Sequence, residues 1–303
     1  MAQQLEIYGN PAKYKAKKII SGFFLYLFLI IVAVIVLLPF YMMVLTSLKT
    51  ESQFEASSFI WWLKPSQFQW NNYRLAFEKL RFWKVLRNTV LVALISTFGT
   101  VITTVLAAFA FARLSFKGRD LVFALLLTTM MIPGELFTIT NYITVSRLGW
   151  LGSGAFGPYG NALAAMTIPF MTSVFYIYFL RQNFKTIPNE LYYAAKVDGT
   201  HDFGYLMRVM IPIASPTIIS IIILNAMGTW NAYIWPSLVI ANKDFVPVTV
   251  ALRDSSFQDE TGQKMLYTAQ MAGATLVTAP LLVIFFALKK YIMRGVSRSG
   301  IKG

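Results

Sequence analysis

The chain has 303 residues, of which 56% are hydrophobic and only 13% are charged. Soluble domains carry about 25% charged residues, so this composition, with a mean hydropathy of +0.58, excludes an ordinary soluble domain. The net charge of +14 comes from basic residues that flank long apolar runs, which favours a membrane surface over nucleic acid as the anionic partner. We therefore predict a membrane protein that binds no nucleic acid.

Cysteine and histidine usage narrows the chemistry further. The absence of cysteine excludes disulfides, thiolate metal sites and cysteine nucleophiles. The single histidine, His201, excludes a histidine-rich metal cluster and leaves little scope for histidine-based catalysis. Because it lies in a polar stretch, we expect its side chain to be solvated.

Six apolar runs are long enough to cross a bilayer as helices, which takes about 20 residues each. They cover residues 19–46, 89–112, 121–145, 161–180, 217–239 and 269–291. The first run follows several lysines but is too long for a secretory signal and lacks a small-residue cleavage site, so we expect an uncleaved helix. The sequence thus predicts an all-α membrane protein with six transmembrane helices.

The distribution of basic residues predicts how the chain is oriented. Six crossings place both termini on one side of the membrane. The short segment 113–120 holds three basic residues, whereas 146–160 holds one, and the positive-inside rule therefore predicts cytoplasmic termini. The predicted organisation is a cytoplasmic tail (1–18), a membrane domain (19–291) with outer segments 47–88 and 240–268, and a cytoplasmic tail (292–303).

The two outer segments differ in character. Segment 47–88 is rich in aromatic residues, which favours a position along the lipid headgroups over a contact surface for an external partner. Segment 240–268 is polar and too long for a simple turn, so it is a candidate docking loop. Its acidic residues are Asp244, Asp254, Asp259 and Glu260.

Glu135 is the one ionisable residue well inside a predicted span. Carboxylates within a membrane are costly and usually functional, which makes Glu135 a candidate residue of the substrate path. The alternative is that Pro133 and Gly134 break the helix and let the carboxylate reach water or a backbone amide.

The polar stretch 181–216 reads as two short helices around a turn at Gly199. Thr186 can cap the first helix, Glu190 lies near its positive end, and Gly199 supplies the positive φ that ends it. Asp202 belongs to the first turn of the second helix. The first helix presents one small, nearly flat face for another protein, made of Leu191, Ala194, Ala195 and Asp198.

The fifth apolar run ends in a second candidate substrate contact. Met227, Asn231 and Trp235 are four residues apart, and the spacing predicts that they share a helix face. Asparagine can bond sugar hydroxyls and tryptophan can stack on a sugar ring. An outer aromatic belt, with asparagine bonding between helices, is the alternative interpretation.

The polar stretch also carries a family resemblance. ELYYAAKVDG (190–199) with a downstream IPIASP (211–216) resembles the cytoplasmic motif of permease subunits in binding-protein-dependent ABC importers. MIPGELFTI (131–139), GTWNAYIWPSLV (228–239) and SRSGIKG (297–303) are similar to maltose-type carbohydrate permeases, specifically the shorter permease partner. The similarity covers nearly the whole chain.

The resemblance implies a type I ABC importer permease fold, in which 181–216 forms a cytoplasmic coupling-helix hairpin. The implied ATPase-coupling residues are Glu190, Tyr193, Ala194, Ala195, Asp198 and Gly199. It further implies a bacterial cell-membrane complex for sugar import. The implied partners are a second homologous permease, a cytoplasmic ABC ATPase dimer and an external sugar-binding protein. ATP and Mg would bind the ATPase, while this chain would bind no cofactor and catalyse no reaction itself.

One departure and two alternatives accompany this interpretation. Tyr193 stands where the motif has glutamate, so a salt bridge from that position to the ATPase cannot be carried over. An ABC permease for a non-sugar solute is one alternative function. The other is a stand-alone secondary transporter that uses Glu135, although such proteins have inverted repeats with several buried charges. The chain has no Walker-type phosphate loop, so energy for pumping has to come from another chain.

Overall fold

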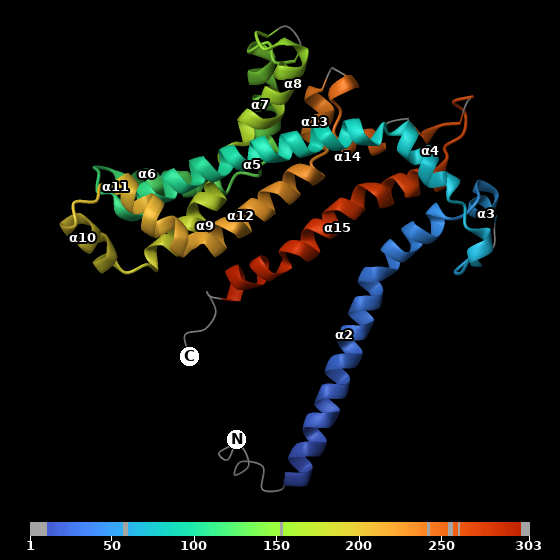
Figure 1. Cartoon of the computed structure of the whole chain (residues 1–303), viewed down its shortest axis with the longest axis horizontal. Helices are drawn as coiled ribbons and strands as arrows, with labels where there is room; N and C mark the ends of the chain where they lie inside the picture. The colour runs from blue at the N-terminus through green and yellow to red at the C-terminus, as the bar shows by residue number, and fades with distance from the viewer. Residues whose placement is uncertain are drawn as a thin grey trace. The chain divides into compact units, whose positions relative to one another are not determined.

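The computed structural model describes residues 11–56, 60–151, 154–240, 243–253, 257–259 and 261–297 (Figure 1). Within these residues the regular structure is helical and no strand forms, which confirms the predicted all-α class. The long helices are α2 (Pro11–Ser47), α5 (Phe82–Arg113), α12 (Ile211–Asn231) and α15 (Tyr267–Ser297). Asp254, Glu260 and the terminal residues 298–303, which entered the sequence analysis, lie outside the described residues.

Shorter helices connect the long ones. The α-helices are α3 (Glu51–Glu55), α4 (Asn71–Lys79), α6 (Arg119–Thr129), α7 (Leu136–Arg147), α8 (Gly157–Thr167), α9 (Val174–Lys185), α10 (Asn189–Val197), α11 (Asp202–Tyr205), α13 (Ile234–Val239) and α14 (Val248–Arg253). Three 3-10 turns cover η1 (Pro65–Gln67), η2 (Ile168–Phe170) and η4 (Lys243–Phe245), and a π-turn covers η3 (Leu206–Met210).

The chain divides into two compact units, Met1–Ala76 with Asp259–Thr275, and Phe77–Gln258 with Leu276–Gly303. In the first unit, the apolar side chains of α2 from Phe23 to Tyr41 are exposed, as expected of a helix that contacts lipid. The end of α2 is fixed by Asn72, whose amide donates to the carbonyls of Ser47 at 2.9 Å and Lys49 at 2.8 Å.

Four helices among the described residues are long and apolar enough to cross a membrane: Lys17–Ser47, Phe82–Arg113, Asp202–Asn231 and Tyr267–Ala287. A bent pair, Gly157–Phe170 and Val174–Lys185, makes a fifth if its two helices, 50° apart, form one span. The protein is therefore multi-pass, while the predicted count of six is not confirmed.

Two of the predicted spans are not single helices. The run 121–145 is interrupted between Thr129 and Leu136, where Pro133 cannot donate a backbone hydrogen bond. The run 217–239 is also interrupted, since α12 ends at Asn231 and α13 begins at Ile234. Both runs keep their apolar composition through the break, which is why composition alone predicted continuous helices.

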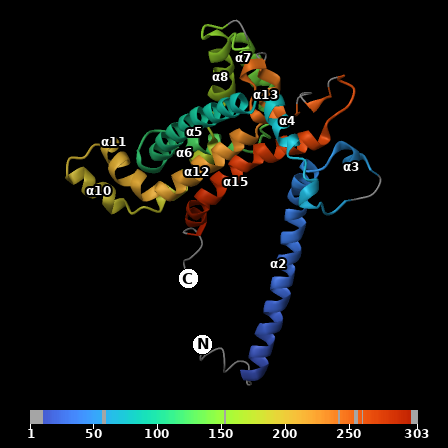
Figure 2. The same ribbon diagram turned by 45° about the vertical axis from the view of Figure 1, so that its right-hand side comes forward.

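In the second unit, α5, α9 and α12 lie side by side and enclose the main core (Figures 1 and 2). Ala108 of α5 is fully buried, and such small residues allow helices to approach closely. The largest fully buried side chains here are Leu180, Phe184, Tyr205, Leu206, Met210 and Ile221. This core places the start of α10 beside the end of α5.

Helix α5 also stabilises the bend between α8 and α9. The hydroxyl of Thr100 donates to the carbonyl of Phe170 at 3.2 Å, and that of Thr103 donates to the carbonyl of Met171 at 2.5 Å. These carbonyls lie at the helix break, where backbone partners are missing and lipid offers none. Gly99 permits the approach, since a Cβ there would lie 2.6 Å from the side chain of Met171.

A buried asparagine joins the start of α5 to the segment before α14. Asn88 is fully buried, and its amide donates to the carbonyls of Asp244 at 3.1 Å and Val246 at 3.3 Å. Its side-chain oxygen accepts a bond from the hydroxyl of Tyr159 at 3.2 Å. One side chain thus connects three separate segments of the second unit.

We predict that Asn88→Ala lowers the free energy of unfolding by about 2 kcal/mol, because it removes the hydrogen bonds that a fully buried side chain makes to two backbone carbonyls and to the hydroxyl of Tyr159. The measurement is the thermal midpoint of the purified protein in detergent. Asn231→Ala is the matched control, since Asn231 is exposed and its amide bonds only the carbonyl of Met227 in its own helix. Equal midpoints for the two variants would contradict this role of Asn88.

Candidate functional site

The polar stretch folds as the predicted pair of helices around a glycine turn. α10 begins at Asn189 with Glu190 in its first turn, and Gly199 follows it with a φ of +72°. No heavy atom would come within 4 Å of a Cβ at Gly199, so backbone conformation alone requires glycine there. The predicted cap by Thr186 is wrong, because Thr186 ends α9 and its hydroxyl donates to the carbonyl of Asn183.

The second helix of the hairpin is not a separate short helix. α11 continues through the π-turn Leu206–Met210 into α12, so the hairpin passes directly into a membrane-length helix. Pro212 offers a physical reason for the wider turn. It has no N–H for the carbonyl of Arg208, and its ring would collide with that carbonyl in a regular α-helix.

Three polar side chains close the hairpin across the glycine turn. The hydroxyl of Tyr192 and the ammonium group of Lys196 both lie 2.7 Å from Asp202 Oδ1. The hydrogen bond to Asp202 raises the pKa of Lys196 above its ordinary value. The ring of Tyr192 also packs edge-on against buried Tyr205, with 5.1 Å between centroids. These contacts fix α10 against the start of the long helix.

Arg113, at the end of α5, holds the other side of the hairpin. Its guanidinium donates to the carbonyls of Phe184 at 2.9 Å and Ile187 at 2.5 Å, and to the side-chain oxygen of Asn189. Charged donors form stronger hydrogen bonds than neutral ones, so this group is an effective connection between helices. The hairpin is thereby connected to both α5 and α12.

The predicted coupling residues differ in how exposed they are to solvent. Glu190, Tyr193, Ala194, Asp198 and Gly199 are exposed, with the side chain of Tyr193 63% accessible. Ala195 does not belong to the exposed face, because it packs against the core formed by α5, α9 and α12.

Sequence reasoning missed Val197, the most exposed large apolar residue of the hairpin at 88%. It lies one turn after Tyr193, so the i, i+4 spacing could have identified it. The outer face of α10 is therefore Glu190, Tyr193, Ala194 and Val197.

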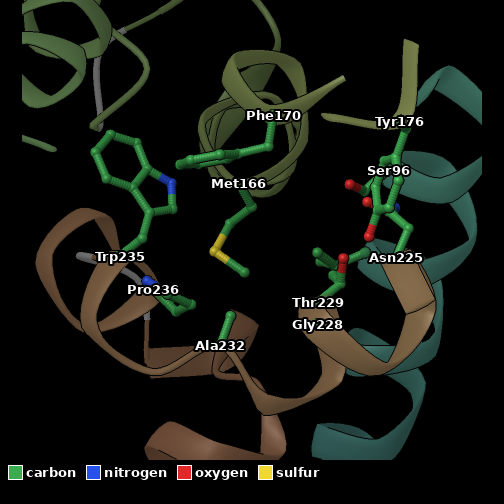
Figure 3. A pocket seen from close by; sticks show the side chains of 11 residues that line it. Ser96, Met166, Phe170, Tyr176, Asn225, Gly228, Thr229, Ala232, Trp235 and Pro236 are labelled. Atoms are coloured by element: carbon green, nitrogen blue, oxygen red, sulfur yellow. The ribbon is translucent and has the colours of Figure 1, made fainter. Parts of the chain in front are cut away.

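A cavity of about 250 Å³ lies within the second unit (Figure 3). It is bounded by α5, the bend between α8 and α9, and the break between α12 and α13. Its lining residues are Val92, Ser96, Met166, Phe170, Tyr176, Asn225, Gly228, Thr229, Ala232, Trp235 and Pro236. Trp235 lies on one side of it, and Ser96, Tyr176, Asn225 and Thr229 lie on the other.

Trp235 lines this cavity and has a structural contact as well. It is 8% exposed, and its indole N–H donates to the carbonyl of Ala165 at 3.0 Å. Four residues after Ala165 stands Pro169, which has no N–H to offer that carbonyl. The indole therefore replaces a missing helical hydrogen bond, and the ring lies edge-on to Phe170.

The other two candidate substrate residues are not beside Trp235. Asn231 is exposed and does not line the cavity, and since α12 ends at Asn231, the predicted shared face with Trp235 is wrong. Glu135 is exposed in the break before α7, as in the alternative in which Pro133 and Gly134 interrupt the helix. Within the described part of the chain, no three His, Cys, Asp or Glu residues are grouped to hold a metal ion.

Comparisons with known proteins agree with this architecture. The family of binding-protein-dependent transport system inner membrane components matches residues 99–298. The arabinooligosaccharides transport system permease protein of Bacillus subtilis is 26% identical, over 91% of this chain and 94% of that protein. The melibiose/raffinose/stachyose import permease protein of Bacillus subtilis is 29% identical, over 97% of this chain and 100% of that protein.

Among solved structures, a chain of a bacterial ABC transporter involved in alginate import is 23% identical. It matches with a TM-score of 0.76, over 91% of this chain and 97% of that chain.

The long apolar helices and the braced polar hairpin define a multi-pass membrane permease. The chain belongs to the family of binding-protein-dependent transport system inner membrane components, which confirms the predicted resemblance. The alginate transporter supports the predicted permease fold at the level of overall topology.

We predict that Trp235→Phe lowers the free energy of unfolding by about 1–3 kcal/mol, since the carbonyl of Ala165 is left buried without a donor. Thermal unfolding in detergent measures this change. Trp83→Phe is the control, because Trp83 lies at the start of α5 with 69% of its side chain exposed. An unchanged midpoint for Trp235→Phe would show that the indole N–H is not required.

Proposed function

We propose that this chain is the membrane subunit of an ATP-driven importer of oligosaccharides, and that it forms half of the translocation pathway. Family membership supports the importer class, and the names of two full-length relatives, for arabinooligosaccharides and for melibiose, raffinose and stachyose, support the substrate class. The chain itself catalyses no reaction in this proposal.

The observation that carries the proposal is the braced hairpin with an exposed outer face. Tyr193 and Val197 present apolar surface away from the core, while Ala195 packs inward. A loop that only joins two membrane helices needs no such construction. We assign the outer face of α10 as the ATPase-docking surface, with Glu190, Tyr193, Ala194, Asp198 and Gly199 at or beside it. In this assignment Tyr193 contributes its ring or hydroxyl where the family motif has glutamate.

The proposal extends to the partners and the topology. A second homologous permease completes the pathway, an ATPase dimer binds ATP and Mg, and an external binding protein delivers the sugar to segment 240–268. The family description, which names a binding-protein-dependent system, supports the last of these partners. Both termini are cytoplasmic, and six crossings result if α6 with α7 and α8 with α9 each cross as a bent pair.

A permease for a non-sugar solute remains the alternative within the same class. A stand-alone transporter that uses Glu135 has less support, because that residue is exposed at a helix break and does not line the cavity. Purification of the chain from its native membrane in mild detergent separates these classes. Copurification of a second permease and an ATPase is expected, whereas active transport by the chain alone would contradict the ABC proposal.

We predict that Gly199→Val abolishes uptake without removing the protein from the membrane. Valine at a φ of +72° costs roughly 1–2 kcal/mol or more in backbone strain, which would open the turn that holds α10. The measurement is uptake of labelled oligosaccharides, with arabinotriose, raffinose and stachyose as a panel, by the transporter reconstituted with its binding protein.

Gly118→Val is the matched control for this variant. Gly118 has a φ of +79° in another turn, and it too has no heavy atom within 4 Å of an added Cβ. Retained uptake in Gly118→Val with lost uptake in Gly199→Val would support the coupling role. Unchanged uptake in Gly199→Val would refute it.

A further inference from the structure

We propose that the turn between α5 and α6, together with the end of α9, binds the phosphate headgroup of an anionic phospholipid. The site consists of Lys117, Arg119 and Lys185, with Arg181 as a fixed charge beside them. The turn follows Arg113, which holds the hairpin, so it lies at the same end of the second unit as α10 (Figure 1). Only the assignment of this end to the cytoplasmic side rests on the proposed function.

Positive charge outweighs negative charge at this site. The guanidinium of Arg119 lies 3.1 Å from Asp120 Oδ1, and that of Arg181 lies 3.9 Å from the same oxygen. Lys185, one turn after Arg181 on α9, interacts electrostatically with both arginines and with Asp120. Three cationic side chains thus share one carboxylate among the described residues, and an excess of positive charge is left.

The one carboxylate is already in use. Both oxygens of Asp120 accept hydrogen bonds from Arg119, at 3.1 and 3.3 Å. Lys117 and Lys185 are exposed, and neither side chain forms an ion pair or a hydrogen bond within the part of the chain that the structure describes. A single unpaired lysine is ordinary on a surface. Lys185, however, is repelled by two arginines, so an anionic ligand relieves an unfavourable interaction there.

Arg181 supplies a positive charge that cannot move away. Its Nε–H donates to the carbonyl of Phe111 at 3.1 Å, and its guanidinium carbon lies 3.9 Å from the centroid of the Phe123 ring. Only 7% of its side chain is exposed. A charge with so little contact to solvent is screened less by salt than an exposed one, so its attraction for an anion is better preserved.

A recess of about 550 Å³ lies in the turn before α6. Lys117, Arg119 and Leu121 are among the residues that line it, so charged and apolar surface meet there. Basic pockets at the cytoplasmic side of membrane helices are known binding sites for acidic lipid headgroups. The recess therefore offers room for a headgroup next to the unpaired lysines.

The apolar surface beside the recess distinguishes a lipid from a free phosphate ion. Leu121 and Leu125 are 66% and 58% exposed and lie one turn apart on the same side of α6. A phospholipid carries its phosphate next to its acyl chains, so it can pair with the lysines and cover both leucines. A free phosphate ion would leave the leucines uncovered, and a lipid without net charge would leave the excess positive charge in place.

The absence of cysteine from this chain permits a local test in the complete transporter, with any reactive cysteine of its other subunits replaced. Ser115→Cys carries a bimane fluorophore, because Ser115 lines the recess and is exposed. The nanodiscs contain spin-labelled phosphatidylglycerol or, at the same mole fraction, spin-labelled phosphatidylcholine. We expect about twofold stronger quenching by phosphatidylglycerol, because only this lipid carries a net negative charge.

Lys185→Gln in the labelled protein tests the assigned charges. It removes one exposed cation from the site, and we expect the preference for phosphatidylglycerol to fall by about half. Lys64→Gln is the matched control, because Lys64 is also exposed, lies in the first unit and gives the same change in net charge. An unchanged preference in Lys185→Gln, or an equal loss in both variants, would overturn the proposal.

Three further outcomes would also overturn it. Equal quenching by the two lipids would mean that the recess meets only bulk lipid. Loss of the preference in millimolar inorganic phosphate at constant ionic strength would assign the site to the free ion. Quenching by neither lipid would mean that a partner subunit covers the recess.

This proposal and the proposed function can fail separately. The quenching measurement requires no transported sugar, so an error in the substrate class does not affect it. If no second permease or ATPase copurifies, the same measurement on the full chain alone still tests the lipid site.

Discussion

Backbone carbonyl groups released at helix breaks set the main constraint on this structure. A bilayer offers no water to satisfy them, so the protein has to supply donors from elsewhere in the chain. Thr100 and Thr103 do so at the bend between α8 and α9, and the indole of Trp235 does so for Ala165. Thr249 donates in the same way to the carbonyl of Ala232, where α12 gives way to α13. The bend between α8 and α9 and the break between α12 and α13 are thus each tied to a neighbouring helix.

This constraint also explains why one region combines bends, aromatic residues and unfilled space. Helices that end early cannot pack along their whole length, and the room that remains between α5, α9 and α12 is the cavity. The irregular backbone and the cavity therefore occur in the same region of the second unit.

Local features of the sequence were predictable, whereas features that depend on distant segments were not. Single residues and their neighbours predict the turn at Gly199, the place of Glu190 in the first turn of α10, and the helix break at Pro133. The break after Asn231 has a local cause as well, since Pro236 has no N–H to offer the carbonyl of Ala232, but the donor that replaces it, Thr249, comes from another segment. The inward position of Ala195 depends on a core assembled from α5, α9 and α12. The cavity likewise needs residues more than one hundred positions apart, which no local pattern encodes.

The π-turn at Leu206–Met210 constrains the number of residues that can join α10 to α12. A π-turn is equivalent to one extra residue in an α-helix, and each residue rotates the chain by about 100°. Deleting one residue from this turn would leave both the hairpin and α12 intact, yet would point the exposed side of α10 in a different direction. The number of residues between the ELYYAAKVDG segment and Pro212 therefore sets the direction in which α10 faces about the axis of α12, more than it sets how far α10 lies from that helix. Insertions and deletions here should be rarer than substitutions.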